Sequence, residues 1–178
     1  LPAPPRHDGL PLGPDGAPLG ELRGVDMLRP AVHALGLGDT FNSAGVEGLH
    51  RFARLCVRAG VTTATDLANP LGEGALQALL AATAEPTFPV RLVPALLAFG
   101  DTPERLVARA VALRAHATER LSLGRIKLVL DGSIQGFTAR LRAGAYADGS
   151  PNGLWYMAPE TVRALFVQAL RHGVQAHV

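Results

Sequence analysis

Short strand-like segments alternate with helical segments along this chain, and this alternation limits the possible folds more than any other feature. β-branched or apolar runs that predict strands begin near residues 61, 90, 126 and 174. Apolar residues at helical spacing predict helices over residues 43–60, 72–84, 102–121 and 159–173. Strands that alternate with helices of this length are typical of parallel βα units, so we expect an α/β fold.

Two architectures satisfy this alternation: an open, doubly wound sheet, or part of a (β/α)8 barrel. The predicted strand over residues 126–130 is apolar except for Lys127, which fits a parallel sheet buried on both faces. A complete barrel needs about 250 residues, and the four strands expected in these 178 residues are about half of one. The chain begins with Leu1 and ends at Val178 inside a predicted strand, so we expect it to be part of a longer protein.

Composition and charge exclude several classes of protein. With 48% apolar and 18% charged residues and a net charge of +2, the chain does not resemble a disordered protein. It has no charge-free apolar run long enough to cross a membrane, and its first 15 residues lack the apolar core of a signal peptide. Its basic residues are interleaved with acidic ones, so we expect no nucleic-acid partner. The single cysteine, Cys56, excludes an intrachain disulfide and fits a reducing compartment, so we expect a cytoplasmic protein.

The opening segment, residues 1–42, differs from the rest of the chain. Seven of the 14 prolines fall in its first 30 residues, with glycines interleaved among them. This pattern predicts an irregular stretch with short extended pieces, and Asp15-Gly16 predicts a hairpin turn. We therefore separate residues 1–42, as an irregular insertion, from a βα region over residues 43–178.

Lys127 is the most distinctive single residue. It is the only lysine among 17 cationic residues, and it lies inside an apolar predicted strand. A buried ammonium group is costly, so such a lysine is neutralised, paired or modified. Two interpretations stay open from its position alone: a functional amine, or a cation at a strand end that pairs with Asp131.

Two further features lie where parallel strands end, which is where α/β proteins place their ligands. The loop after residue 130 offers the polar side chains Asp131, Ser133 and Gln135. Its serine is not in a G-x-S-x-G elbow, so a serine nucleophile is disfavoured. His177 lies in the last predicted strand, where a histidine can be a metal ligand, a base or a core residue.

Several of these segments together resemble one family, the metal-dependent amidohydrolase superfamily. The branch they resemble most includes N-substituted formamide deformylase. The segments that carry the resemblance occur in this order: Gly60-Val-Thr-Thr-Ala-Thr-Asp66, Ile126-Lys-Leu-Val-Leu-Asp-Gly-Ser133, Thr138-Ala-Arg-Leu141, Asn152-Gly-Leu154 and Val174-Gln-Ala-His177.

The resemblance implies a (β/α)8 TIM barrel, of which this chain would supply strands two to five, with residues 1–42 over the barrel mouth. It also implies one or two divalent metal ions, usually zinc. Lys127 matches the family's carboxylated lysine, and His177 matches its fifth-strand histidine. The family's H-x-H pair, sixth-strand histidine and eighth-strand aspartate have no counterpart in this sequence.

The function implied is hydrolysis of carbon–nitrogen bonds other than peptide bonds, with a metal-activated hydroxide as nucleophile and a small amide or formamide as substrate. Asp131, Ser133 and Gln135 are then the candidate substrate-binding residues. The alternative is a catalytically inactive part of a barrel that serves as an assembly or interaction module. Neither reading requires a membrane, and homo-oligomerisation is left open.

Overall fold

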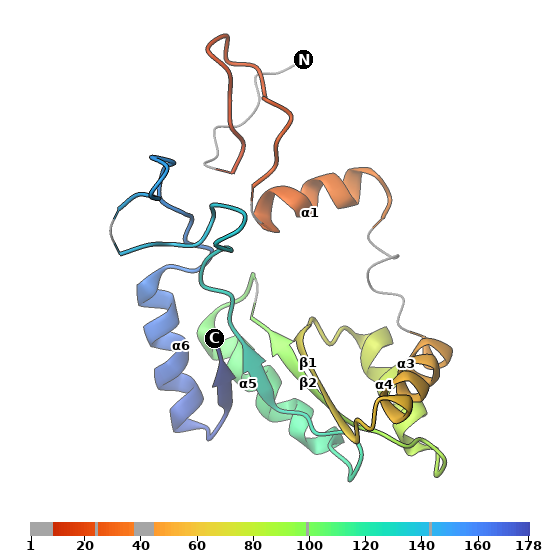
Figure 1. The fold of residues 1–178 in the computed structure, drawn as a ribbon. Coiled ribbons are helices and arrows are strands. Elements are labelled where there is room, and N and C mark those ends of the chain that lie inside the picture. The colour runs from red at the N-terminus through yellow and green to blue at the C-terminus, as the bar shows by residue number, and fades with distance from the viewer. Residues whose placement is uncertain (1–8, 24, 38–44, 99, 143) are drawn as a thin grey trace. The chain divides into compact units, whose positions relative to one another are not determined.

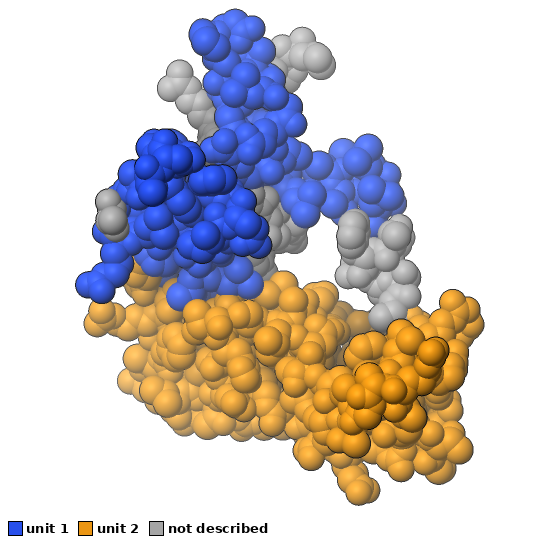
Figure 2. Space-filling model, viewed as in Figure 1, with its two compact units in different colours: residues 1–40, 129–158 blue, residues 41–128, 159–178 orange. Residues whose placement is uncertain are grey.

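The computed structural model describes residues 9–23, 25–37, 45–98, 100–142 and 144–178. The chain divides into two compact units (Figure 2). Unit 1 comprises residues 1–40 and 129–158, and unit 2 comprises residues 41–128 and 159–178. The predicted roles of residues 1–42 as an insertion and 43–178 as a barrel region stay predictions.

Unit 2 contains a parallel four-stranded sheet, which confirms the expected α/β class. Its strands are β1 (Thr63–Asn69), β2 (Arg91–Leu97), β3 (Arg125–Lys127) and β4 (Gln175–His177). They pair side by side in chain order, and every pair is parallel. All four begin within two residues of their predicted starts. The sheet is consistent with part of an α/β barrel, and closure into a full barrel stays a prediction.

In the described part of unit 2, four α-helices connect or precede these strands. They are α3 (Val46–Arg58), α4 (Glu73–Ala84), α5 (Pro103–Leu113) and α6 (Pro159–Arg171). Figure 1 shows α5 behind the strands of the sheet. Helix α5 begins as predicted, with the Thr102 hydroxyl accepting from the Arg105 backbone N–H, but it ends eight residues before residue 121. The reason is a competing strand-like contact, in which the Leu92 N–H donates to the Arg120 carbonyl at 2.8 Å.

The two faces of the sheet differ in burial. Side chains alternate between faces along each strand, and the residues of one set are fully buried: Leu96, Ile126 and Leu128 each have 0% exposure. The other set includes Leu97, Lys127 and His177, and all three are only half-buried. The core of unit 2 therefore lies between the sheet and its helices, and on β3 and β4 the polar side chains lie on the opposite face.

Glycine ends the two helices that lead into strands β1 and β4. Gly60 follows α3 with φ +72° and Gly173 follows α6 with φ +60°, a left-handed conformation that favours glycine. In both turns the next residue donates back into the helix: Val61 N–H to the Cys56 carbonyl, and Val174 N–H to the Ala169 carbonyl, each at 2.8 Å. Turns of the same type thus connect α3 to β1 and α6 to β4.

Unit 1 corrects one expectation from the sequence. The predicted irregular stretch contains a helix, α1 (Val25–Ala34), which has Pro30 inside it. The many prolines and glycines around it made the sequence pattern indicate loop instead of helix. A turn at Gly36, with φ +65°, follows the end of the helix. The predicted turn at Asp15-Gly16 is confirmed, because Leu12 and Pro18 form an antiparallel bridge across it.

No helix in the described ranges is both long enough and apolar enough to cross a membrane.

Candidate metal centre

Lys127 and His177 lie side by side at the carboxyl ends of two neighbouring strands. The parallel register of β3 and β4 pairs them directly, one pair beyond Ile126 and Ala176. Paired residues of neighbouring strands point to the same face, with their Cα atoms about 4.8 Å apart. The fold thus brings together two residues that are 50 positions apart in the sequence.

The surroundings of this pair leave both side chains available. Each is half-buried on the face of the sheet opposite the fully buried Ile126 and Leu128. Among the described residues of unit 2, neither the Lys127 amine nor the His177 ring has a hydrogen-bond or ion-pair partner. Backbone bonds hold their strands, since the Leu128 N–H donates to the His177 carbonyl and the Ala98 N–H to the Lys127 carbonyl, each at 2.8 Å.

The pair fits a metal ion as part of a ligand set. A neutral imidazole is a common ligand for divalent metals, and a lysine becomes an oxygen ligand when its amine carries a carboxylate group. Two ligands are fewer than the three or four that zinc takes from a protein, so a metal held here needs others. No cluster of three or more His, Cys, Asp or Glu side chains suited to a metal occurs within the described residues.

Arg125 and Gln175 form a second pair on the same two strands, and the sequence reasoning missed it. They are paired in register two residues before Lys127 and His177, and the Arg125 Nε donates to the Gln175 Oε1 at 2.9 Å. Alternation along a strand puts Arg125 on the same face as Lys127, but the sequence assigns Arg125 no partner without the register.

The three predicted substrate-binding residues lie in unit 1, on the loop that follows β3. One Asp131 side-chain oxygen accepts from the Arg140 backbone N–H at 2.7 Å. The Asp131 backbone also forms an isolated antiparallel β-bridge with Trp155. The Ser133 backbone N–H donates to the Thr138 hydroxyl at 3.0 Å, and Gln135 is exposed. Asp131 therefore contributes to the loop's own structure, and the substrate-binding role of all three residues stays a prediction.

Two further segments of the family resemblance, residues 138–141 and 152–154, meet in the same part of unit 1. Asn152 bonds the backbone of Leu141 twice, accepting from its N–H at 2.7 Å and donating to its carbonyl at 2.8 Å. Arg140 donates to the Gly153 carbonyl at 2.9 Å. Gly153 is buried against backbone, and a Cβ there would lie 2.1 Å from the Ala139 carbonyl oxygen. The loop thus leaves no room for a side chain at residue 153 and uses the Asn152 amide to hold residue 141.

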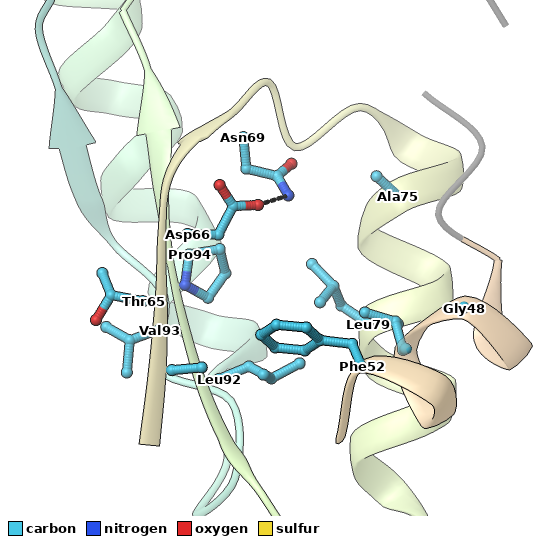
Figure 3. Close-up of a pocket in the computed structure, with 12 residues that line it drawn as sticks. Gly48, Phe52, Thr65, Asp66, Asn69, Ala75, Leu79, Leu92, Val93 and Pro94 are labelled. Atoms are coloured by element: carbon cyan, nitrogen blue, oxygen red, sulfur yellow. Dashed lines mark hydrogen bonds between the residues drawn. The ribbon is translucent and has the colours of Figure 1, made fainter. Parts of the chain in front are cut away.

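A separate cavity lies elsewhere in unit 2, between helices α3 and α4 and strands β1 and β2. Figure 3 shows Phe52 directed toward Leu92, and a hydrogen bond of 2.8 Å from Asn69 to Asp66 at the cavity's rim. The cavity has a volume of about 470 Å³ and a mostly apolar lining. Its polar lining residues are Thr65, Asp66 and Asn69, all on β1.

Two solved structures are similar to this fold. One is an uncharacterised metal-dependent hydrolase from Pyrococcus horikoshii OT3, with a TM-score of 0.57 and 20% identity, and the match covers 94% of this chain and 33% of that one. The other is an uncharacterised metal-dependent hydrolase from Pyrococcus furiosus, with a TM-score of 0.59 and 18% identity, covering 97% and 34%. No protein-family model and no curated protein matches the chain. The chain thus shares the fold of these structures over about a third of their length.

Proposed function

We propose that this chain forms part of a metal-dependent hydrolase that cleaves carbon–nitrogen bonds other than peptide bonds. The observation that carries the proposal is the register pair of Lys127 and His177, half-buried and without side-chain partners among the described residues of unit 2. The metal-dependent hydrolases that share the fold support the general reaction class. The resemblance to N-substituted formamide deformylase supports an amide or formamide substrate.

Lys127 serves in this proposal as a carboxylated lysine. Its ammonium group first loses one proton; the neutral amine then forms a bond to the carbon of CO2 and releases a second proton, which leaves an anion with two oxygens. The His177 imidazole supplies a neutral nitrogen beside it. Imidazole and carboxylate-type ligands together suit zinc, in one or two ions. When bound, the metal would polarise the substrate carbonyl and activate water for attack.

The remaining parts of the site are not all assigned to this chain. Asp131, Ser133 and Gln135 are proposed to hydrogen-bond the amide or formamide group of the substrate. The general base and further metal ligands of the family pattern have no counterpart in these 178 residues. The proposal therefore places them elsewhere in a longer polypeptide, in keeping with the third of the similar structures that the chain spans.

Activity measurements on the intact protein test this function. N-substituted formamides, simple amides and a dipeptide should be supplied as substrates before and after removal of metal by a chelator. We expect turnover of a formamide or an amide that is lost with the metal and restored by zinc, and no cleavage of the dipeptide. No turnover of any formamide or amide in the zinc-loaded protein would contradict the proposal and favour an inactive assembly module.

Substitution of Lys127 tests its role in that activity. Lys127→Ala should be inactive, and a short carboxylic acid added with zinc should restore part of the turnover by supplying the missing oxygens. Lys127→Arg should also be inactive but should not respond to the acid, because the guanidinium stays protonated and fills the space. An active Lys127→Arg variant would exclude the carboxylated lysine.

A further inference from the structure

The Arg125 side chain links three segments by hydrogen bonds. It lies two residues before Lys127 on β3, on the same face of the sheet. Its Nε donates to the Gln175 side chain on β4 at 2.9 Å, and its Nη1 donates to the Ser122 hydroxyl at 2.8 Å. The Ser122 backbone N–H in turn donates to the Leu92 carbonyl on β2, also at 2.9 Å. One side chain therefore connects β4, β3 and a segment bonded to β2.

We call the hydrogen bonds of Arg125 to Gln175 and Ser122 the Arg125 tie. It links the two shortest strands of the sheet. Strands β3 and β4 have three residues each, whereas β1 and β2 have seven. A short strand pair has few backbone hydrogen bonds to fix its register, so a side-chain bond across it carries a larger share of the alignment. The tied residues share a face with Lys127 and His177 and lie two positions, about 6.6 Å, behind them.

We infer that Arg125 and Gln175 are positioning residues, which hold β3 and β4 in the register that sets Lys127 beside His177. The inference rests on the proposed function, because it assigns the pair a purpose in a metal centre. Groups that fix the orientation of metal ligands contribute to metal affinity, and loss of one that is bonded directly to a ligand lowers it about 10- to 100-fold.

Three substitutions at Arg125 and Gln175 differ in which hydrogen bonds they remove. Arg125→Leu removes both donors, and Gln175→Leu removes only the acceptor on β4. Gln175→Glu keeps an acceptor oxygen of the same reach, and the exposed position of Gln175 tolerates a charge. We expect the two leucine variants to lose alignment and Gln175→Glu to retain it.

Arg114 provides a matched control for Arg125. It also anchors the segment that leads into β4, by donating to the backbone carbonyls of His172 and Gly173. It lies in the short 3-10 helix after α5, outside the sheet. Arg114→Leu should therefore lower stability without changing the alignment of Lys127 with His177.

The deciding experiment measures zinc affinity and amide hydrogen exchange in the intact protein. Zinc affinity, by competition with a chromophoric chelator, should fall about tenfold or more in Arg125→Leu and Gln175→Leu and stay within about twofold of wild type in Gln175→Glu and Arg114→Leu. In the metal-free protein, the Leu128 amide, which donates to the His177 carbonyl, should exchange faster in Arg125→Leu than in Arg114→Leu.

The outcomes separate this inference from the proposed function. If Arg125→Leu keeps wild-type zinc affinity, or Arg114→Leu loses as much as Arg125→Leu, the positioning role is overturned. If the wild-type protein binds no zinc, the proposed function fails. The exchange rate of the Leu128 amide alone then tests whether the Arg125 tie holds β3 and β4 in register. Equal exchange in Arg125→Leu and Arg114→Leu overturns the tie, and faster exchange in Arg125→Leu supports it.

Discussion

The sheet of unit 2 and the loops of unit 1 are held together by different forces. In unit 2, large apolar side chains are completely buried, among them Phe88, Leu96 and Leu165 with 0% exposure. In the described loops over residues 129–158, the buried residues are small: Thr138, Ala139 and Gly153. Side chains there bond to backbone instead, as Asn152 does to Leu141. Apolar packing tolerates many sequences, whereas such loops need particular residues at particular positions.

The largest effect should come from the core of unit 2. Phe88→Ala removes a fully buried ring that also contacts the His50 ring edge-on at a centroid distance of 5.4 Å. We expect a loss of about 3–5 kcal/mol in the free energy of unfolding. Chemical denaturation of the intact protein measures it, with Leu170→Ala as control, since Leu170 is 78% exposed. Equal effects of the two substitutions would contradict the burial described for unit 2.

The same glycine-to-alanine change should have opposite signs in the two regions. In unit 1, a Cβ on Gly132 would lie 2.0 Å from the Thr138 hydroxyl oxygen, so Gly132→Ala should destabilise the loop by about 1–3 kcal/mol. In α3 of unit 2, a Cβ on Gly48 meets nothing within 4 Å, so Gly48→Ala should stabilise by about 0.5–1 kcal/mol. Thermal unfolding of both variants checks the signs, and a stabilising Gly132→Ala would refute the close approach.

A smaller effect is expected from the side-chain bonds of unit 1. Asn152→Ala leaves the Leu141 and Gly153 backbone N–H groups without their shared acceptor, at a cost of about 1–2 kcal/mol. Hydrogen exchange should show the change at residues 141 and 153, while the amides of strands β1 and β2 keep wild-type rates. Asn152→Asp keeps the acceptor and should retain more of the protection at these two amides than Asn152→Ala.

The smallest effect is a pH dependence confined to one turn of unit 1. The Ser150 backbone N–H, and then its hydroxyl, hold the pKa of the exposed Asp148 carboxyl below its ordinary value. A carboxyl whose pKa is lower in the folded state stabilises the turn above its unfolded pKa of about 3.9 and loses this contribution as the pH falls through the folded value. An NMR titration of Asp148 should show the lowered pKa, and Ser150→Ala should reverse only part of the shift. Titration at the ordinary value in wild type would contradict the bonded turn.

The same contrast explains what could be predicted from the sequence. The strand starts near residues 61, 90, 126 and 174 were predictable, because apolar periodicity reports burial against helices. The end of α5 was not, because Leu121 leaves the helical pattern to bridge Leu92, a contact set by the sheet. Helix α1 was missed, since its sequence signal lies among prolines and glycines.

The candidate site was predictable only in part, for a related reason. Lys127 and His177 stood out as unusual residues on apolar strands, and the register of β3 and β4 places them together. Arg125 and Gln175 carried no such signal, because their pairing depends on the register itself. The structural role of Asp131 could not be predicted either, since the hydrogen bond that it accepts from the Arg140 N–H exists only in the folded loop.

The central claim is that Lys127 and His177 belong to one metal centre, and metal content tests it most directly. The intact protein should be purified without chelator, alongside Lys127→Arg and His177→Asn, and its zinc measured by elemental analysis. The account predicts one or two zinc ions in wild type and a marked loss in both variants, with folding preserved by circular dichroism. Absence of bound divalent metal from the wild-type protein, or full metal content in both folded variants, would contradict it.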